Sequence, residues 1–419
     1  MSVKQNIIDH NEFSTETGYL RPGESDFRSE ICLNGRWDFQ PVDLPDGFTP
    51  GESIPELPLP KPDQWESVKL KVPSPWNING LVDGDGIPGG DFVCYPSYPE
   101  RWKHVKMGWL KRTLQVPEDW GEKTILLHFE AVCGHCQVYI DGKKVGEHFD
   151  NSMPETYLLD DFVTPGKEHT LWVGVRAPEL FNVKNGSTQF TYPTGSFFNM
   201  NTTGIWQDVF LLGVPKAHIK DVFVQPDPTS DQLIIQVTIS NQSGQTASVS
   251  VNGIVKALKP FSFPDDGIKV VPHYDLEDDP VLEFPGGQIT VSPNAEAVID
   301  FRVTVSGNLL PWDMRKPNLY AILVTLEQGG KTIDRKYTRF GWREFKIKNG
   351  DFYLNDYKIQ IKADSWHFMG IPQLTRRYAF AWYKALNDAG GNGVRLHAMP
   401  YPTFYLEVAD EMGICVLDE

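Results

Sequence analysis

The chain has 419 residues, of which 40% are hydrophobic and 22% are charged. This composition is typical of a globular protein with two or three domains and argues against wholesale disorder or a fibrous repeat. The formal net charge of -16 disfavours nucleic acid and anionic membranes as partners, and no apolar run reaches the roughly 18 residues of a membrane span.

The first residues, MSVKQNIIDHNEF, lack the basic and apolar regions of a secretory signal. The compartment stays open: cytoplasmic, or secreted or periplasmic if a signal has been removed. Five cysteines are too few for a disulfide framework. Cys133 and Cys136 form one CxxC motif, CGHC, without a second pair at zinc spacing. We predict that it is a tight turn between strands and not a redox or zinc site.

Residues 1–215 contain short alternating apolar segments that predict an antiparallel, jelly-roll-like β-sandwich. The predicted strands are residues 124–132, 137–140, a short one around Val145, 169–177 and 205–212. Asp141-Gly142, between two of them, predicts a two-residue hairpin. Residues 43–62 are rich in proline and acidic residues and predict a surface loop, either ordered or floppy.

Residues 216–340 repeat the alternating pattern and predict an immunoglobulin-like sandwich. The predicted strands lie at residues 233–239, around 249–251, at 298–305 and at 320–326. The acidic, proline-rich residues 259–293 interrupt the pattern and predict an insertion.

From about residue 341 the pattern becomes β-α-β-α-β, the unit of a parallel sheet. Strands are predicted at residues 358–363, 393–396 and 414–417. A helix at 375–387 carries Tyr378, Trp382 and Leu386 on one face, and a second helix is marked by Phe404, Val408 and Met412. Gly390-Gly391 and Gly413 predict where these helices stop. Three strands and two helices cannot complete a barrel or a doubly wound sheet. The domain therefore either continues beyond the chain, which we favour, or packs on another element.

Polar or ionisable residues follow each predicted parallel strand, at the edge where α/β folds bind ligands. They are Asp364, Ser365, Trp366 and His367 after the first strand, Arg395 and His397 at the second, and Asp418 and Glu419 after the third. Other catalytic arrangements are missing, because the sequence has no GxGxxG after a strand, no GxxxxGK[ST], no HExxH and no GxSxG.

Seven segments, in order, resemble glycoside hydrolase family 2, which includes β-galactosidases, β-glucuronidases and β-mannosidases. They are LNGRWDF at 33–39, VPSPW at 72–76, VYIDGKKVGEH at 138–148, TGIWQDVFL at 203–211, RKPNLY at 315–320, RFGWREFKIKNGDFYLND at 339–356 and GNGVRLHAMPYPTFYLEVADEMGICVLDE at 391–419. The resemblance implies a mainly β, multidomain fold: a galactose-binding-type jelly roll over 1–215, an immunoglobulin-like sandwich over 216–340, and the first three strands of a (β/α)8 TIM barrel over 341–419.

The resemblance also implies retaining hydrolysis by a glutamate acid/base and a glutamate nucleophile. Both are expected beyond residue 419, so we predict that this chain contains neither and is inactive alone. His367 matches a family active-site histidine and Arg395 matches the arginine of the pocket floor, whereas His397 lies one position earlier than its family counterpart. The expected substrate-binding residues are His367, Arg395, His397, Trp366, Asp364 and Asn77.

The sugar is not predicted, because this chain departs from lactose-cleaving β-galactosidases. Pro75 stands where they have asparagine, and Phe197–Met200 (FFNM) stands where they have an acidic sugar-binding residue. Family galactosidases use Mg²⁺ and Na⁺, but no ligand set is recognisable, so no cofactor or metal site is predicted. The expected partner is a carbohydrate substrate, and a homo-oligomer is possible. The unfinished barrel predicts poor solubility, dimerisation through its open edge or a disordered C-terminal tail. The alternatives are a non-catalytic carbohydrate-binding module and a scaffold protein.

Overall fold

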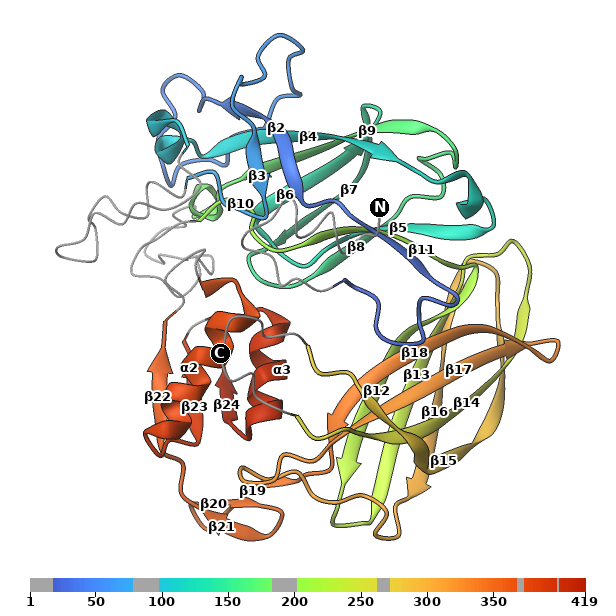
Figure 1. The fold of residues 1–419 in the computed structure, drawn as a ribbon. Coiled ribbons are helices and arrows are strands. Elements are labelled where there is room, and N and C mark those ends of the chain that lie inside the picture. Colours follow the sequence, from blue (N-terminus) through green and yellow to red (C-terminus); the bar gives the residue numbers. More distant parts are fainter. Residues whose placement is uncertain (1–17, 78–97, 183–201, 262–271, 368–372, 398) are drawn as a thin grey trace.

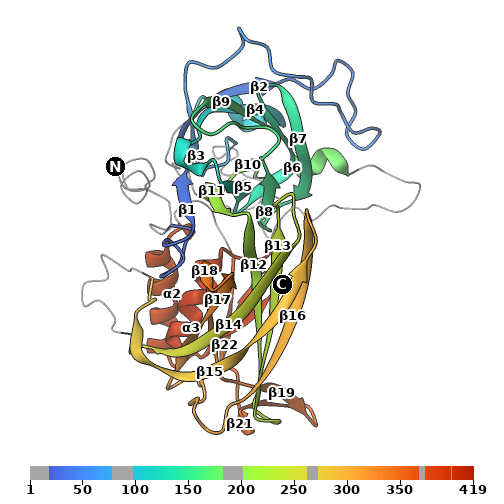
Figure 2. The ribbon, with the colours of Figure 1, turned by 90° about the vertical axis from the view of Figure 1, so that its right-hand side faces the viewer.

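A computed structural model describes residues 18–77, 98–182, 202–261, 272–367, 373–397 and 399–419. The fold is mainly β and multidomain. Two β-sandwiches are stacked one above the other, and a smaller unit with helices α2 and α3 lies beside the second sandwich and below the first (Figure 1). Figure 2 shows the same arrangement after a quarter turn. In the described part of the chain, no helix is long and apolar enough to cross a bilayer.

The first sandwich packs a seven-stranded sheet against a four-stranded sheet. Their facing side chains form one apolar core, which includes Trp37, Leu110 and Leu127. The larger sheet contains β10 (Gly204–Ile205), β6 (Val132–Ile140), β9 (Glu168–Arg176), β4 (Met107–Gln115), β2 (Gly35–Val42) and β3 (Leu70–Val72), with β7 (Lys143–Asp150) paired to β6. The smaller sheet is β1 (Ser29–Cys32), β11 (Val209–Pro215), β5 (Lys123–Phe129) and β8 (Glu155–Leu158).

The hairpin predicted at Asp141-Gly142 is confirmed. Strands β6 and β7 pair antiparallel on either side of it, and both turn residues have positive φ, as a type I′ turn requires. The turn predicted at CGHC is wrong, because Cys133 and Cys136 lie inside strand β6. Both thiols are buried and unoxidised, and burial raises the pKa of Cys133 to about 12, so neither suits redox or metal chemistry.

The second sandwich packs a three-stranded sheet against a four-stranded sheet. The strands are β12 (Ala217–Asp227), β13 (Gln232–Asn241) and β16 (Ala295–Thr304) in one sheet, and β15 (Leu276–Val291), β14 (Ala247–Leu258), β17 (Leu319–Gln328) and β18 (Lys331–Gly341) in the other. The expected insertion at residues 259–293 is largely wrong, because β15 is a full edge strand paired with β14.

A small meander precedes the parallel unit. It consists of β19 (Phe345–Lys348), β20 (Asp351–Leu354) and β21 (Tyr357–Ile359), paired antiparallel in that order. The register places apolar side chains on one face, and four of them are exposed: Phe345 (43%), Ile347 (67%), Phe352 (40%) and Tyr357 (78%). Lys346, Lys348 and Lys358 lie on the opposite face. This amphipathic sheet has an apolar face that the rest of the described chain leaves largely uncovered.

The parallel unit consists of β22 (Ala363–Trp366), α2 (Arg376–Asp388), β23 (Gly393–Leu396), α3 (Thr403–Met412) and β24 (Cys415–Asp418). Strands β22, β23 and β24 are neighbours and parallel, as predicted. The first strand begins later than expected, because residues 357–359 belong to β21. The side chain of Thr375 caps α2 by accepting a hydrogen bond from the Tyr378 backbone N–H, and Gly413 ends α3 in the left-handed conformation.

The predicted inner face of α2 is only partly correct. The buried side chains are Arg376, Ala379, Phe380 and Tyr383. Trp382 and Leu386 lie at the margin of the core, whereas Tyr378 is exposed.

Residues 18–28, here called the junction segment, join the three parts through buried charges. The Glu24 carboxylate accepts a hydrogen bond from the Tyr337 backbone N–H at 2.9 Å, and Arg28 pairs with Asp334 of β18 at 2.6 Å. At the other end of the segment, Arg21 lies 3.5 Å from Glu407 of α3. The segment therefore contacts both the second sandwich and the parallel unit before the chain enters the first sandwich.

Candidate functional site

The parallel sheet has two different faces, set by the alternation of its strands. Trp366 points to the face covered by the helices, where its ring stacks on Trp382 of α2 with centroids 3.7 Å apart. Ser365 and Arg395 point to the opposite face and are hydrogen-bonded to each other at 3.1 Å. Leu417 is paired with Arg395 in the neighbouring strand and is 59% exposed. We call this second side the open face.

Two histidines meet at the carboxyl ends of β22 and β23. The rings of His367 and His397 are 4.4 Å apart between centroids, and the backbone N–H of His397 continues the parallel ladder by donating to the Trp366 carbonyl at 3.0 Å. Burial lowers the pKa of His367, and the neighbouring His397 and Arg395 lower it further. A neutral His367 ring offers one nitrogen donor and one acceptor near pH 7.

Arg395 lies on β23, two residues before His397, and its side chain is held by Glu419. Its guanidinium binds both carboxylate oxygens of Glu419, at 2.8 Å and 2.7 Å, and its Nε donates to the same carboxylate at 2.9 Å. Such a two-pronged contact orients the planar group more strictly than a single ion pair. The side chain is only partly buried, so it remains available to a ligand on the open face.

Three of the other predicted residues are placed elsewhere. Trp366 is 2% exposed and stacked in the core, so its ring is not available to a sugar, and we remove it from the site. Asp364 lies on the helix-covered side of the sheet, in register with Val394, and its carboxylate accepts from the Ser365 backbone N–H. Asn77 is buried in the first sandwich, where its side-chain oxygen accepts from the Thr203 backbone N–H at 3.0 Å.

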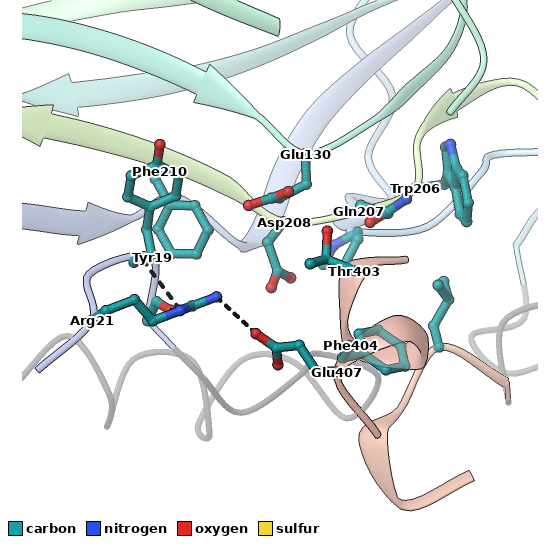
Figure 3. A pocket seen from close by; sticks show the side chains of 13 residues that line it. Tyr19, Arg21, Glu130, Trp206, Gln207, Asp208, Phe210, Thr403, Phe404 and Glu407 are labelled. Atoms are coloured by element: carbon teal, nitrogen blue, oxygen red, sulfur yellow. Dashed lines mark hydrogen bonds and ion pairs between the residues drawn. The ribbon is translucent and has the colours of Figure 1, made fainter. Parts of the chain in front are cut away.

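The structure also has a cavity that the sequence did not indicate. It measures about 80 Å³ and lies where the first sandwich, the junction segment and α3 meet. Figure 3 shows Glu130, Asp208 and Glu407 around it, with Arg21 bridging to Glu407. None of the predicted site residues lines it. Because its charged groups come from segments far apart in the chain, no local motif could have revealed it.

No metal step is assigned to this chain. In the residues that the structure describes, no three His, Cys, Asp or Glu side chains come together in a way that could hold a metal ion. The Glu419 carboxylate is bound by Arg395.

Comparison with known proteins identifies the family. Residues 31–215 match the model of the glycosyl hydrolases family 2 sugar binding domain, and residues 270–343 match a second model, glycosyl hydrolases family 2. Together the two matches cover more than half of the chain.

Curated relatives align along most of the chain. A β-galactosidase of Priestia megaterium is 24% identical over 92% of this chain and 35% of its own length. A putative β-glucuronidase of Formosa agariphila is 26% identical over 85% of this chain and 38% of its own length. The chain therefore spans somewhat more than a third of these relatives.

Solved structures share the fold. A Bacteroides uniformis β-glucuronidase superposes with a TM-score of 0.69 at 20% identity, covering 93% of this chain and 42% of that one. A family 2 β-galacturonidase of Eisenbergiella tayi superposes with a TM-score of 0.66 at 19% identity, covering 94% and 58%. With the two sandwiches, the parallel unit and the two matched models in agreement, the chain belongs to glycoside hydrolase family 2.

Proposed function

We propose that this chain is the amino-terminal part of a glycosidase that hydrolyses β-linked glycosides by the retaining, two-carboxylate mechanism. Its family and its relatives, named for β-galactosidase, β-glucuronidase and β-galacturonidase activities, support this. The chain covers only 35–38% of the first two curated relatives, and in this proposal the activity belongs to a longer protein that contains it.

We assign three domains to the chain: a jelly roll over residues 1–215, an immunoglobulin-like sandwich over 216–340, and the first three strands of a (β/α)8 barrel over 341–419. The open face supports the last assignment. A parallel sheet is normally covered on both faces, yet helices α2 and α3 cover only one face here, and Leu417 on the other is 59% exposed. Further barrel strands would enclose that face and bury Leu417.

The observation that carries the proposal is the pairing of His367 and His397 at adjacent strand ends, with Arg395 on the same face. Ligands of barrel enzymes bind at this edge. Imidazole nitrogens and a fixed guanidinium suit the hydroxyl and ring oxygens of a sugar. We assign these three residues to one wall of the substrate pocket.

The catalytic pair is expected on later barrel strands. Retaining hydrolysis needs two carboxyl groups about 5 Å apart. In the described parallel unit, the carboxylate on the open face is that of Glu419, directly after β24, and it is bound to Arg395. Asp364 and Asp418 lie on the helix-covered side, in register with Val394 and Leu396. We therefore expect no hydrolysis by residues 1–419 alone.

The sugar remains open in this proposal. Pro75, the departure from lactose-cleaving enzymes, lies beside Gly204 at the edge of the first sandwich. The second departure, Phe197–Met200, lies outside the described residues. These differences are the reason for testing several sugars.

The test is an assay of nitrophenyl β-glycosides with galactose, glucuronic acid, galacturonic acid, mannose and glucose. The 419-residue chain and a version extended through a complete barrel are measured side by side. We expect activity only in the extended chain, and loss of that activity when Arg395 is changed. Turnover by the short chain would place the catalytic carboxylates before residue 419. An inactive extended chain that binds a glycan through residues 1–215 would favour the carbohydrate-binding alternative.

A further inference from the structure

The outer face of the seven-stranded sheet holds a proline-rich segment of the chain itself. Strands β2 and β3 are neighbours in the sheet, but the connection between them is long and loops over the top of the first sandwich (Figure 1). Within it, residues 54–61 (IPELPLPK) cross the face formed by the adjacent strands β9, β4 and β2. We call these residues the proline segment.

The sheet holds the backbone of the proline segment at every third residue. The contacts are Arg176 Nη1 to the Pro55 oxygen at 2.7 Å, Trp109 Nε1 to the Pro58 oxygen at 2.7 Å, Gln40 Nε2 to the Lys61 oxygen at 2.6 Å, and the Lys61 N–H to Gln40 Oε1 at 2.8 Å. A polyproline II helix has three residues per turn and no internal hydrogen bonds, so its carbonyls must be satisfied from outside. The spacing of 55, 58 and 61 matches that period, with one anchor from each of three neighbouring strands.

The sheet beneath the proline segment leaves room for an apolar side chain. At Gly174 of β9, a Cβ atom would lie only 2.7 Å from Leu57 and 2.7 Å from the ring of Trp109. The missing side chain therefore lets Leu57 rest on the sheet beside the indole, where it joins the apolar cluster that contains Met107. Trp109 is completely buried under the segment.

The side chains of the segment divide between the sheet and solvent. Pro55 is buried, and Leu57 and Pro60 are half-buried, whereas Glu56, Pro58 and Leu59 are exposed. An indole N–H that donates to a carbonyl of an extended proline-rich chain, next to a shaped apolar pocket, is the arrangement by which aromatic grooves recognise polyproline peptides. The groove therefore recognises backbone carbonyls and the apolar residues at 55, 57 and 60, and tolerates other residues at 56, 58 and 59.

We propose that this outer face is a binding groove for an extended proline-rich peptide, occupied in this protein by its own residues 54–61. The groove accepts a peptide of the same spacing from outside once the resident segment is released. This site is separate from the proposed sugar pocket and does not depend on hydrolase activity.

The test releases the segment from the folded protein. Protease sites are introduced at residues 49–52 and 62–64, the protein is cleaved after folding, and the freed peptide is removed. A fluorescently labelled peptide of residues 53–62 is then titrated and followed by anisotropy. We expect saturable binding to the cleaved protein, at least tenfold weaker binding to the intact protein, and no binding of a peptide of equal composition with permuted prolines. Equal binding of both peptides would overturn the proposal.

Two further measurements test the proposal if the protein with the protease sites does not fold. Trp109→Phe keeps the ring but removes one donor, and we expect about five- to tenfold weaker binding of the peptide. In the intact protein, excess peptide should increase hydrogen exchange at the Lys61 amide, which Gln40 protects, and the permuted peptide should not. If millimolar peptide neither binds the cleaved protein nor alters exchange in the intact one, the segment is only a loop and the groove has no affinity of its own.

Discussion

Replacing Arg28 by methionine tests whether the junction segment is held by its buried ion pair. The Asp334 carboxylate accepts three hydrogen bonds: from Arg28 Nε at 2.9 Å, from Arg28 Nη2 at 2.6 Å and from the Ile219 N–H at 2.7 Å. The side chains of Arg28 and Asp334 are only 4% and 0% exposed. Arg28→Met therefore leaves a carboxylate in the interior with one donor in place of three.

The expected loss in free energy of unfolding is about 3–5 kcal/mol, the cost of breaking a buried pair by removing one partner. For a sandwich of this size, that is a fall in melting temperature of roughly 10–20 °C. Arg335→Met is the matched control. Arg335 follows Asp334 directly in the sequence, but its nearest carboxylate partner is the exposed Asp26, 3.9 Å away. We expect the control to change stability by less than about 0.5 kcal/mol.

The assay is urea unfolding of the purified chain, followed by circular dichroism and tryptophan fluorescence. Adding Asp334→Leu to Arg28→Met should recover at least 1 kcal/mol, because the uncompensated charge is gone. A single variant within 1 kcal/mol of the parent chain, or a double variant weaker than the single one, would refute the reasoning.

Three more predictions concern pH, assembly and catalysis. Burial lowers the pKa of His218 to about 4, so as the pH falls the unfolded chain binds a proton before the folded chain does. The free energy of unfolding should therefore fall by up to about 3 kcal/mol between about pH 6.5 and pH 4. His218→Gln should reduce this loss, as measured by thermal unfolding at pH 7 and pH 4.5. Ile347→Ser with Tyr357→Ser should reduce concentration-dependent self-association in sedimentation velocity, whereas Lys358→Ser on the charged face should not. In an active, extended chain, Arg395→Lys should lower kcat/KM at least tenfold with an unchanged melting temperature, because lysine cannot reproduce the two-pronged contact with Glu419.

The elements with strong local signals could be predicted from the sequence. The hairpin at Asp141-Gly142 and the ends of α2 and α3 follow from residues that favour one backbone conformation. The prediction of a turn at CGHC was wrong because glycine is common in turns and the motif lies between two alternating apolar segments. Strand β6 continues through it because it pairs with β7, β9 and β10, which are distant in sequence. Strand β15 was missed because its exposed edge carries acidic residues and prolines.

The candidate site was predicted as a set of strand-end residues but not as a face of a sheet. Sequence spacing brought His367, Arg395 and His397 to the same edge, and these are the residues that the structure brings together. Asp364 and Trp366 alternate with Ser365 and His367 along and directly after β22, so their side chains point to the opposite face of the sheet. A shift of one residue moves a side chain to the other face of a strand, and the first strand was placed several residues too early.

The ion pairs that join β18, α3 and α2 could not be predicted from the sequence, and they help to position the site. Arg339 of β18 binds Glu411 of α3 at 2.6 Å, and Arg376 of α2 binds Glu411 and Glu407. A buried ion pair offsets the cost of removing its charges from water only when its geometry is good, so these pairs favour one arrangement of the helices. The two helices on the covered face are thus fixed to the second sandwich through Arg339. Because the same helices pack on β22–β24, the strand ends that carry the histidine pair are positioned relative to the second sandwich.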